Sequence, residues 1–362
     1  MSLLRAAFGI ALIGSIQAED FRPLFNGRDL TGWVVVNTAP STWHFDAEGL
    51  LVCSGKPIGE IRTERMYQNF ILELEWRHLV PKGNAGVFVW ADDITARGQP
   101  FHRGIEVQIL EEAYGNTRSY TTHGDIFPIH GATMTPVNGR GGSRAFPVEN
   151  RAKPSPEWNH YRIECRDGSI SLAVNGKVVT RGEHCSPSKG YICLESEGGV
   201  VNYRNVRLRE LPDTPVDAKD VAIANRGFRS LYTGVDLSGW RTGDGWKVND
   251  WILSSAGLSE ARSEENFAGD LGFIIDFRFG KAAKFASVSL RGAKVVLDPC
   301  APVMAPVAKW NRLEGRVSGE KLTIRVNGQD VDSVTREAGL DSPLTLGSDG
   351  PVDWANFYVR YQ

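Results

Sequence analysis

Residues 103–110, Arg-Gly-Ile-Glu-Val-Gln-Ile-Leu, predict a β-strand whose two faces differ in polarity. The apolar residues at 105, 107 and 109 alternate with Glu106 and Gln108, and this period of two puts the two kinds of side chain on opposite faces. Ile and Val suit a half-buried pleated surface. A carboxylate and an amide side by side on the other face could line a groove that holds a polar ligand.

A weaker copy of this stretch occurs at residues 291–298, Arg-Gly-Ala-Lys-Val-Val-Leu-Asp, with Lys294 at the Glu106 position and Val296 at the Gln108 position. Other segments repeat in the same order. For example, PLFNGRDLTGW at 23–33 returns as SLYTGVDLSGW at 230–240. We therefore predict two copies of one fold, of which the second lacks the polar pair.

The fold class follows from the length of the strand-like runs. They cover five to eight residues and are separated by Gly, Asn, Asp and Pro, and no stretch keeps a period of 3.6. Asn175-Gly176 is typical of a two-residue hairpin turn. We predict an all-β protein of two tandem jelly-roll β-sandwiches, at 20–211 and 226–362, joined by a linker at 212–225.

Residues 1–18 are predicted to be a signal peptide, because Arg5 precedes an apolar run at 6–16 and Ala18 follows as a small residue for cleavage. This run is too short for a comfortable membrane span, and no later run is longer, so we expect an exported periplasmic or extracellular protein without a span in the mature chain. The net charge of -2 and the absence of Lys/Arg runs argue against nucleic acid as a partner. The oligomeric state and any cysteine pairing stay open.

The chemistry is predicted to lie in the first half. Glu106 aligns with Lys294 at an offset of 188 and Trp158 with Trp310 at an offset of 152, so the first half has 36 extra residues at roughly 111–156. A long loop of mixed composition is usually functional or disordered. A shorter insertion covers about 91–102. All seven histidines lie in the first half, which random placement would rarely produce.

Several motifs within residues 24–211 resemble the 3-keto-disaccharide hydrolase domain family. They are Phe25-Asn-Gly-Arg-Asp-Leu-Thr-Gly-Trp33, Asn84-Ala-Gly-Val-Phe-Val-Trp90, Gly104-Ile-Glu-Val-Gln-Ile109, Glu157-Trp-Asn159, Asn175-Gly176 and Gly190-Tyr-Ile-Cys-Leu-Glu195. This resemblance implies a fold like that of the concanavalin A lectins and glucanases. It also implies hydrolysis of glycosides that carry a ketone at carbon 3 of the sugar. The ketone acidifies the proton at carbon 2, a base removes this proton, the aglycone leaves from carbon 1, and water then adds.

Such a mechanism needs a base, a donor to the enolate oxygen and an acid for the leaving group. Glu106 is the first candidate for the base or for a sugar-binding carboxylate, and His123 and His130 are candidate general acids or bases because imidazole titrates near neutral pH. A 3-keto oligosaccharide or glycoside is the expected ligand. The predicted substrate-binding residues are Asn84, Trp90, His102, Arg103, Gln108, Asp125 and Lys153.

We predict no cofactor and no metal. His102, Glu106, His123, Asp125 and His130 could converge on a divalent ion, but their spacing matches no zinc motif. Two carboxylates for ordinary glycosidase chemistry could come from Glu106 and Glu112. The competing functional hypotheses are a non-catalytic carbohydrate-binding module that uses Asn84, Gln108 and Trp90, and a structural protein without a sugar site. The second domain is expected to pack against the first or to bind a partner.

Overall fold

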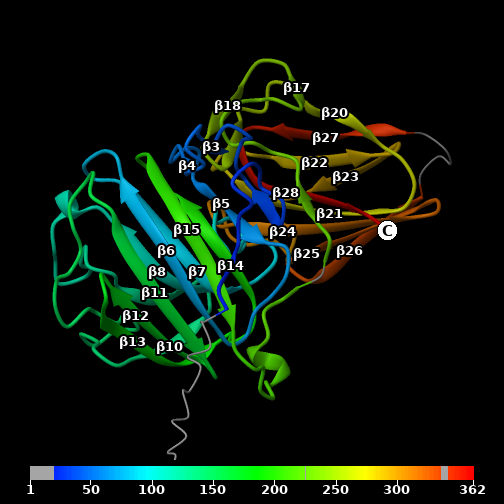
Figure 1. The fold of residues 1–362 in the computed structure, drawn as a ribbon. Helices are drawn as coiled ribbons and strands as arrows, with labels where there is room; N and C mark the ends of the chain where they lie inside the picture. Colours follow the sequence, from blue (N-terminus) through cyan, green and yellow to red (C-terminus); the bar gives the residue numbers. More distant parts are fainter. Residues whose placement is uncertain (1–19, 225, 336–340) are drawn as a thin grey trace, which may run out of the picture.

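The computed structural model describes residues 20–224, 226–335 and 341–362, and in this part the chain is almost entirely β-structure. The two sandwiches lie beside each other (Figure 1). This confirms the predicted fold class. The proposed signal peptide at 1–18 lies outside the described residues. None of the helices in the described part has the length and apolar composition needed to cross a membrane.

The first domain consists of two antiparallel sheets that enclose one core. The larger sheet runs in the order β10 (Thr133–Pro136), β13 (Lys177–Ser186), β12 (Ser169–Val174), β11 (Asn159–Arg166), β6 (Phe70–His78), β15 (Val201–Glu210), β4 (Leu51–Cys53) and β3 (Trp43–Phe45), with β1 (Arg22–Pro23) against β15. The smaller sheet runs in the order β2 (Trp33–Val36), β5 (Gly59–Thr63), β14 (Tyr191–Ser196), β7 (Asn84–Ala91), β8 (Gly104–Leu110) and β9 (Ile126–Ile129).

The second domain repeats this order. One sheet runs as β18 (Trp246–Asn249), β19 (Ile252–Ser255), β28 (Val352–Tyr361), β21 (Leu271–Phe279), β24 (Asn311–Ser318), β25 (Lys321–Val326) and β26 (Gln329–Thr335), with β16 (Arg229–Ser230) against β28. The other runs as β17 (Trp240–Thr242), β20 (Ala261–Phe267), β27 (Ser342–Asp349), β22 (Phe285–Leu290) and β23 (Ala293–Leu297). Strand β23 occupies the position in the second domain's sheet that β8 occupies in the first domain's smaller sheet, which confirms that the element at 103–110 is duplicated.

The insertion at about 111–156 is more ordered than a loop. It contains the 3-10 helix η1 (Glu112–Tyr114) and the strands β9 and β10, which extend one edge of each sheet. Both strands are four residues long and contain a proline, Pro128 and Pro136. Proline is tolerated at sheet edges because it lacks the amide donor, and it also hides such strands from pattern analysis. The expectation of a loop without strand structure is therefore wrong at these two places.

Two local patterns predicted from the sequence, the alternation at 105–109 and the turn at 175–176, are present in the first domain. Ile105, Val107 and Ile109 point into the core between the sheets, so Glu106 and Gln108 lie on the outer face of the smaller sheet. The hairpin at 169–179 turns at Asn175-Gly176, and both residues have positive φ (47° and 89°) as its two-residue turn requires.

The segment at 212–224 contains the 3-10 helix η2 (Ala218–Asp220) and follows the surface of the first domain. Its Asp220 carbonyl accepts a hydrogen bond from the Ser188 amide (2.7 Å), and the Pro212 carbonyl accepts one from Asn69 Nδ2 (2.9 Å). The five cysteines are free, and Cys300 is the exposed one.

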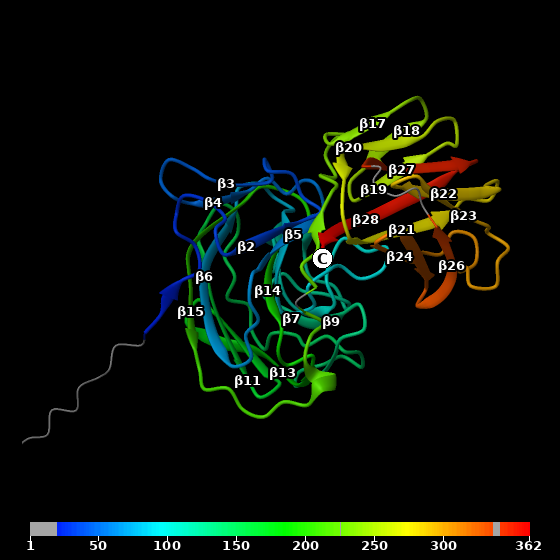
Figure 2. The same cartoon turned by 90° about the vertical axis from the view of Figure 1, so that its right-hand side faces the viewer.

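The interface between the domains is both apolar and polar. Val36 and Ile94 of the first domain pack against Ile274 and Tyr358 of the second. Beside them the segment that joins β7 to β8 reaches the sheet of β21 and β28 (Figure 2). The carboxylate of Asp276 on β21 accepts a hydrogen bond there from the Gly98 amide (2.7 Å).

The buried polar contacts at this interface converge on Asp276. Arg312 on β24 donates two hydrogen bonds to its carboxylate, from Nε (2.7 Å) and Nη2 (2.8 Å), and Asn356 on β28 donates a third from Nδ2 (2.7 Å). Arg312 also donates to the Thr95 carbonyl (2.9 Å). The second domain therefore holds a segment of the first by directed bonds, not only by apolar contact.

Candidate functional site

A cleft of about 420 Å³ lies over the outer face of the smaller sheet, at the positions predicted from residues 103–110. Its volume is within the usual range for small-molecule sites, roughly 300–1,000 Å³. The lining combines acidic, amide and apolar side chains, namely Ile58, Asn84, Gln99, Pro100, Phe101, Glu106, Gln108, Phe127, Ile129, His130, Arg144, Glu195, Glu197 and Trp251. A larger groove of about 960 Å³ between the domains, around Val34 and Arg229, does not include these carboxylates.

Sheet register brings three carboxylates together in the cleft. On β8, Glu106 pairs with Phe88 and Gln108 with Gly86 of β7, while Glu195 comes from β14 on the other side of β7. Gly86 supplies the space between them. A Cβ at this position would lie 2.8 Å from Glu195 Oε2 and 3.1 Å from Glu106 Oε1, so a side chain there would displace one of the two carboxylates.

Glu197 completes this carboxylate cluster, defined here as Glu106, Glu195 and Glu197. It follows β14 by one residue and its Oε2 accepts a hydrogen bond from Asn84 Nδ2. Asn84 Oδ1 in turn accepts one from Gln108 Nε2 (2.9 Å). The two amides are thereby fixed in orientation, and they present their remaining polar groups toward the cleft.

The carboxylate cluster binds protons more strongly than free glutamates do. Burial raises the pKa of Glu106 well above its usual value, and the nearby Glu197 carboxylate raises it further. Burial and the charges of Glu106 and Glu197 act in the same way on the pKa of Glu195. Burial raises the pKa of Glu197 to about 7, against an opposing hydrogen bond with Glu195. Glu197 can therefore gain or lose a proton near neutral pH, and its two neighbours keep theirs to higher pH than a free glutamate does.

One cation and one imidazole face the same space. Arg144 donates to Asp125 Oδ2 (3.0 Å), and its guanidinium carbon lies 3.4 Å from the centroid of the Phe127 ring. His130 directly follows β9, has φ 52° and is partly exposed at the cleft. The surrounding protein desolvates its ring and lowers its pKa, although the Glu60 carboxylate opposes this effect. His130 is therefore neutral, and able to accept a proton, at neutral pH.

Comparison with known proteins relates this geometry to a family. Residues 20–209, more than half of the chain, match the 3-keto-alpha-glucoside-1,2-lyase-like domain. The chain belongs to this family. The predicted resemblance is thereby confirmed, and membership indicates a carbohydrate-active, glycosyl-hydrolase-like protein with a sugar ligand. No curated protein matches the chain.

Several solved structures are similar to part of this chain. A candidate glycosyl hydrolase from Parabacteroides distasonis ATCC 8503 is 21% identical, with a TM-score of 0.40 over 53% of this chain and 94% of its own. A second from the same strain is 23% identical, with a TM-score of 0.39 over 53% and 100% of the two chains. The carbohydrate-binding module CBM66 from Bacillus subtilis is 13% identical, with a TM-score of 0.36 over 49% and 96%.

Of the residues predicted from sequence, four line the cleft of this lyase-like domain. They are Asn84, Glu106, Gln108 and His130. Asp125 lies directly behind the lining, where it is fully buried and bonded to Arg144 and to the Thr121 amide (2.9 Å). Hydrogen bonds connect Asn84, Gln108, Arg144 and Asp125 in one group.

The other predicted residues lie outside the cleft lining. Trp90 is fully buried and its Nε1 donates to the Gln68 carbonyl (2.8 Å), so its ring belongs to the core and cannot stack on a sugar. Arg103 forms two bonds of 3.0 Å with Asp92. The remaining positions are His102 (buried), His123 (buried, with Nε2 3.0 Å from Asn116 Nδ2), Glu112 (in η1) and Lys153 (exposed).

The site residues predicted from the sequence do not include Glu195, Glu197 or Arg144. Glu197 aligns with Asp349 of the second half, so the two halves give no contrast at this position. Glu195 aligns with Gly347, and this loss of a carboxylate is the signal that could have identified it. Arg144 lies in the insertion, which has no counterpart in the second half with which it could be compared.

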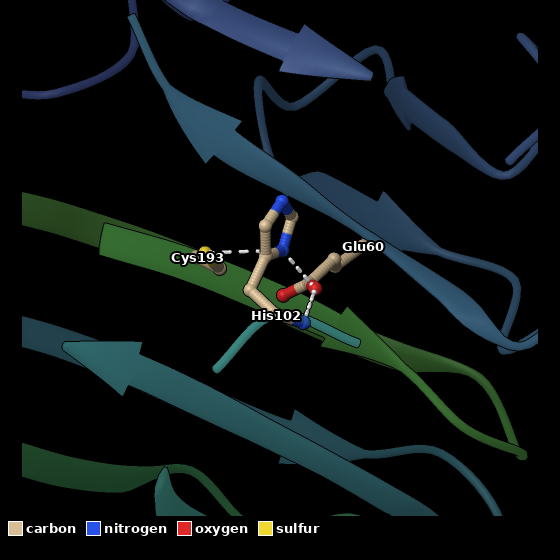
Figure 3. A group of neighbouring side chains, drawn as sticks. All are labelled: Glu60, His102 and Cys193. Carbon is tan, nitrogen blue, oxygen red and sulfur yellow. Dashed lines mark hydrogen bonds and ion pairs between the residues drawn. The ribbon is translucent and has the colours of Figure 1, made fainter. Parts of the chain in front are cut away.

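A second polar cluster, in which all three residues are buried, contains Glu60, His102 and Cys193 (Figure 3). The Glu60 carboxylate accepts from both the backbone amide (2.7 Å) and the ring Nδ1 of His102, and Cys193 Sγ lies 3.9 Å from the same Nδ1. Carboxylate, imidazole and thiolate are zinc ligands. Burial raises the pKa of the Cys193 thiol well above its usual value, and the Glu60 charge adds to this. The contacts of the cluster join β5, β14 and the segment before β8.

The carboxylate cluster predicts an unusual dependence of stability on pH. Because the pKa of Glu197 is about 7 in the folded protein and 4.5 in a free side chain, the folded state retains a proton that the unfolded state releases between these values. The free energy of unfolding therefore falls as pH rises through this window. We expect Glu197→Gln to be more stable than wild type at pH 8, by up to about 3 kcal/mol, and equal to it at pH 4. Urea unfolding at both pH values measures this.

Glu73 provides the matched control for this pH effect. Burial raises the pKa of Glu73, but hydrogen bonds from Arg162 (2.7 Å) and Arg207 (2.6 Å) outweigh burial and lower it overall. Ionised Glu73 stabilises the folded protein at pH values above the pKa of a free glutamate, and this stabilisation is lost as pH falls. Glu73→Gln should therefore destabilise the protein at pH 8. A Glu197→Gln variant no more stable than wild type at pH 8 would contradict the raised pKa.

Proposed function

We propose that the first domain cleaves 3-keto-glycosides by elimination followed by hydration, with the carboxylate cluster as its acid and base. The convergence of Glu106, Glu195 and Glu197 in one cleft is the observation that supports this most directly. Burying carboxylates costs stability, and carboxyl groups whose pKa values are raised by burial suit a reaction with two proton transfers.

The proposed roles follow from the state of each carboxyl group. Glu197 has a pKa of about 7 and is the more accessible, so it takes the proton from carbon 2. Glu106, whose pKa burial raises well above the usual value, donates a proton to the glycosidic oxygen. The bond from carbon 1 to the aglycone then breaks and a double bond forms between carbons 1 and 2. Water next adds its oxygen to carbon 1 and a proton to carbon 2, which gives net hydrolysis.

Charge that develops on the ketone oxygen needs a fixed donor. Arg144 supplies one, because Asp125 and the Phe127 ring hold its guanidinium at the edge of the cleft. Asn84 and Gln108 bind the sugar hydroxyls through amide groups whose orientation their mutual bond fixes. His130 is the second candidate base, since it is neutral and lines the same cleft. Export, inferred from residues 1–18, places this activity outside the cytoplasm.

Product release from a 3-keto-glucoside with a chromogenic aglycone tests the proposal. We expect wild-type protein to release the aglycone from the 3-keto compound and not from the corresponding unoxidised glucoside, because only the ketone acidifies the proton at carbon 2. Exchange of that proton with deuterated water gives an independent readout of proton abstraction. Binding of the 3-keto-glucoside without release or exchange would reject the enzyme and favour a carbohydrate-binding module.

A further inference from the structure

The tip of a hairpin from the second domain reaches the cleft of the first. Strands β18 and β19 pair Asn249 with Ile252, so Asp250 and Trp251 form a two-residue turn. Trp251 Nε1 donates to the Gly98 carbonyl (3.3 Å), and Asp250 Oδ1 accepts from the Ile58 amide (3.4 Å). The turn is thereby bonded to two separate segments that line the cleft, and the Trp251 side chain is part of the lining.

The same domain also fixes the neighbouring wall of the cleft. Gln99, Pro100 and Phe101 are lining residues from the segment between β7 and β8. This segment is held at the Gly98 amide by Asp276 (2.7 Å) and at the Gln99 carbonyl by Asn356 Nδ2 (3.1 Å). The place of Gly98 against the second domain is tight, because a Cβ there would lie 2.1 Å from the Trp310 ring.

The result is an apolar part of the cleft beside the carboxylates. Ile58, Pro100, Phe101 and Trp251 contribute its apolar surface, and the first three are half-buried or buried. An indole presents a large flat face, and the C–H face of a pyranose ring packs well on such a surface. By contrast, hydroxyl groups are better matched by the amides and the carboxylate cluster across the cleft.

We propose that the second domain completes a binding subsite for the leaving group of the substrate, in which Trp251 stacks on the second sugar ring of a 3-keto-disaccharide. This inference rests on the proposed function, because it assigns the oxidised ring to the carboxylate cluster and the leaving ring to the Trp251 side. The second domain is then part of the binding site and not only a second copy of the fold.

The test compares two substrates in one variant. For Trp251→Ala we expect KM to rise about tenfold for the 3-keto form of a glucose disaccharide, and to change less than twofold for methyl 3-keto-glucoside, which has no second ring. Trp251→Phe should recover most of the loss, because a flat ring remains. Trp246→Ala is the control within the same hairpin, since Trp246 bonds to the Ser259 carbonyl (3.2 Å) outside the cleft lining. Circular dichroism and thermal unfolding verify the fold of each variant.

The outcomes separate this subsite from the proposed reaction. Equal changes for both substrates, or no change for the disaccharide, would overturn the subsite while leaving the reaction in place. If wild type turns over neither substrate, the reaction is rejected and calorimetric binding of the two compounds decides the subsite. Weaker disaccharide binding by Trp251→Ala, with methyl glucoside binding unchanged, would support it. Absence of disaccharide binding by wild type would overturn it.

Discussion

Glu106→Gln is expected to lower kcat for a 3-keto-glycoside by about 10²–10⁴-fold, with KM changed only modestly. Gln preserves the shape of the side chain and its place beside Gly86, but it has no proton to transfer to the leaving oxygen. Steady-state release of a chromogenic aglycone measures the effect. The loss should be smaller for an aglycone that is a better leaving group, because such a group depends less on protonation.

Glu112→Gln is the matched control for this loss. Glu112 lies in η1 outside the cleft lining, although the sequence made it a candidate partner of Glu106. We expect it to change kcat less than twofold. If Glu106→Gln retained wild-type kcat at neutral pH, proton donation by Glu106 would be rejected and the carboxylate would be assigned to sugar binding.

The pH profile distinguishes the two acid–base candidates. With Glu197 as the base, kcat/KM should rise with pH around an apparent pKa near 7, since the carboxyl must lose its proton before it can accept one. Glu197→Gln should remove this rising limb together with most of the activity. His130→Ala should leave the limb in place. The reverse pattern would assign the base to His130, whose lowered pKa predicts a limb at more acidic pH.

The sequence was informative about the fold because the chain contains the same pattern twice. Alternation at 103–110, the hairpin at 175–176 and the repeated Gly-Trp and Trp-Asn segments all depend on local geometry, and local geometry is encoded over a few neighbouring residues. The same comparison identified Glu106 and Gln108, because Lys294 and Val296 replace them on an exposed strand face.

The sequence was less informative about residues whose role depends on distant partners. Trp90 and His102 have the chemistry of ligand-binding residues, yet sheet packing buries both, and nothing in their neighbours along the chain indicates this. Glu197 reaches the cleft only because β14 lies on the far side of β7 from β8. Trp251 reaches it from another domain. Such positions depend on the order of strands in the sheet and on the packing of the two domains, and a pattern over a few neighbouring residues does not predict either.

The largest effect on stability is expected from Asp276→Ala, at about 3–5 kcal/mol. The Asp276 carboxylate is fully buried and accepts hydrogen bonds from Arg312, Asn356 and the Gly98 amide. Removal of the carboxylate leaves the Arg312 guanidinium, 17% exposed, without its counter-charge. Urea unfolding followed by tryptophan fluorescence should show the loss in the transition that includes the second domain, since two domains need not unfold together.

Asp353→Ala is the control for the effect of burial on the loss of an ion pair. Asp353 is also paired with an arginine, Arg278 at 2.8 Å, but the two side chains are 29% and 32% exposed, and we expect a loss of at most about 1 kcal/mol. Replacing Arg312 by Met in the Asp276→Ala background should recover part of the stability, because no unpaired charge then remains buried.

Asp276→Ala should also raise KM for the 3-keto-disaccharide, since it releases Gly98 and the adjoining cleft wall. Equal losses in Asp276→Ala and Asp353→Ala would show that the interface network does not hold the domains together.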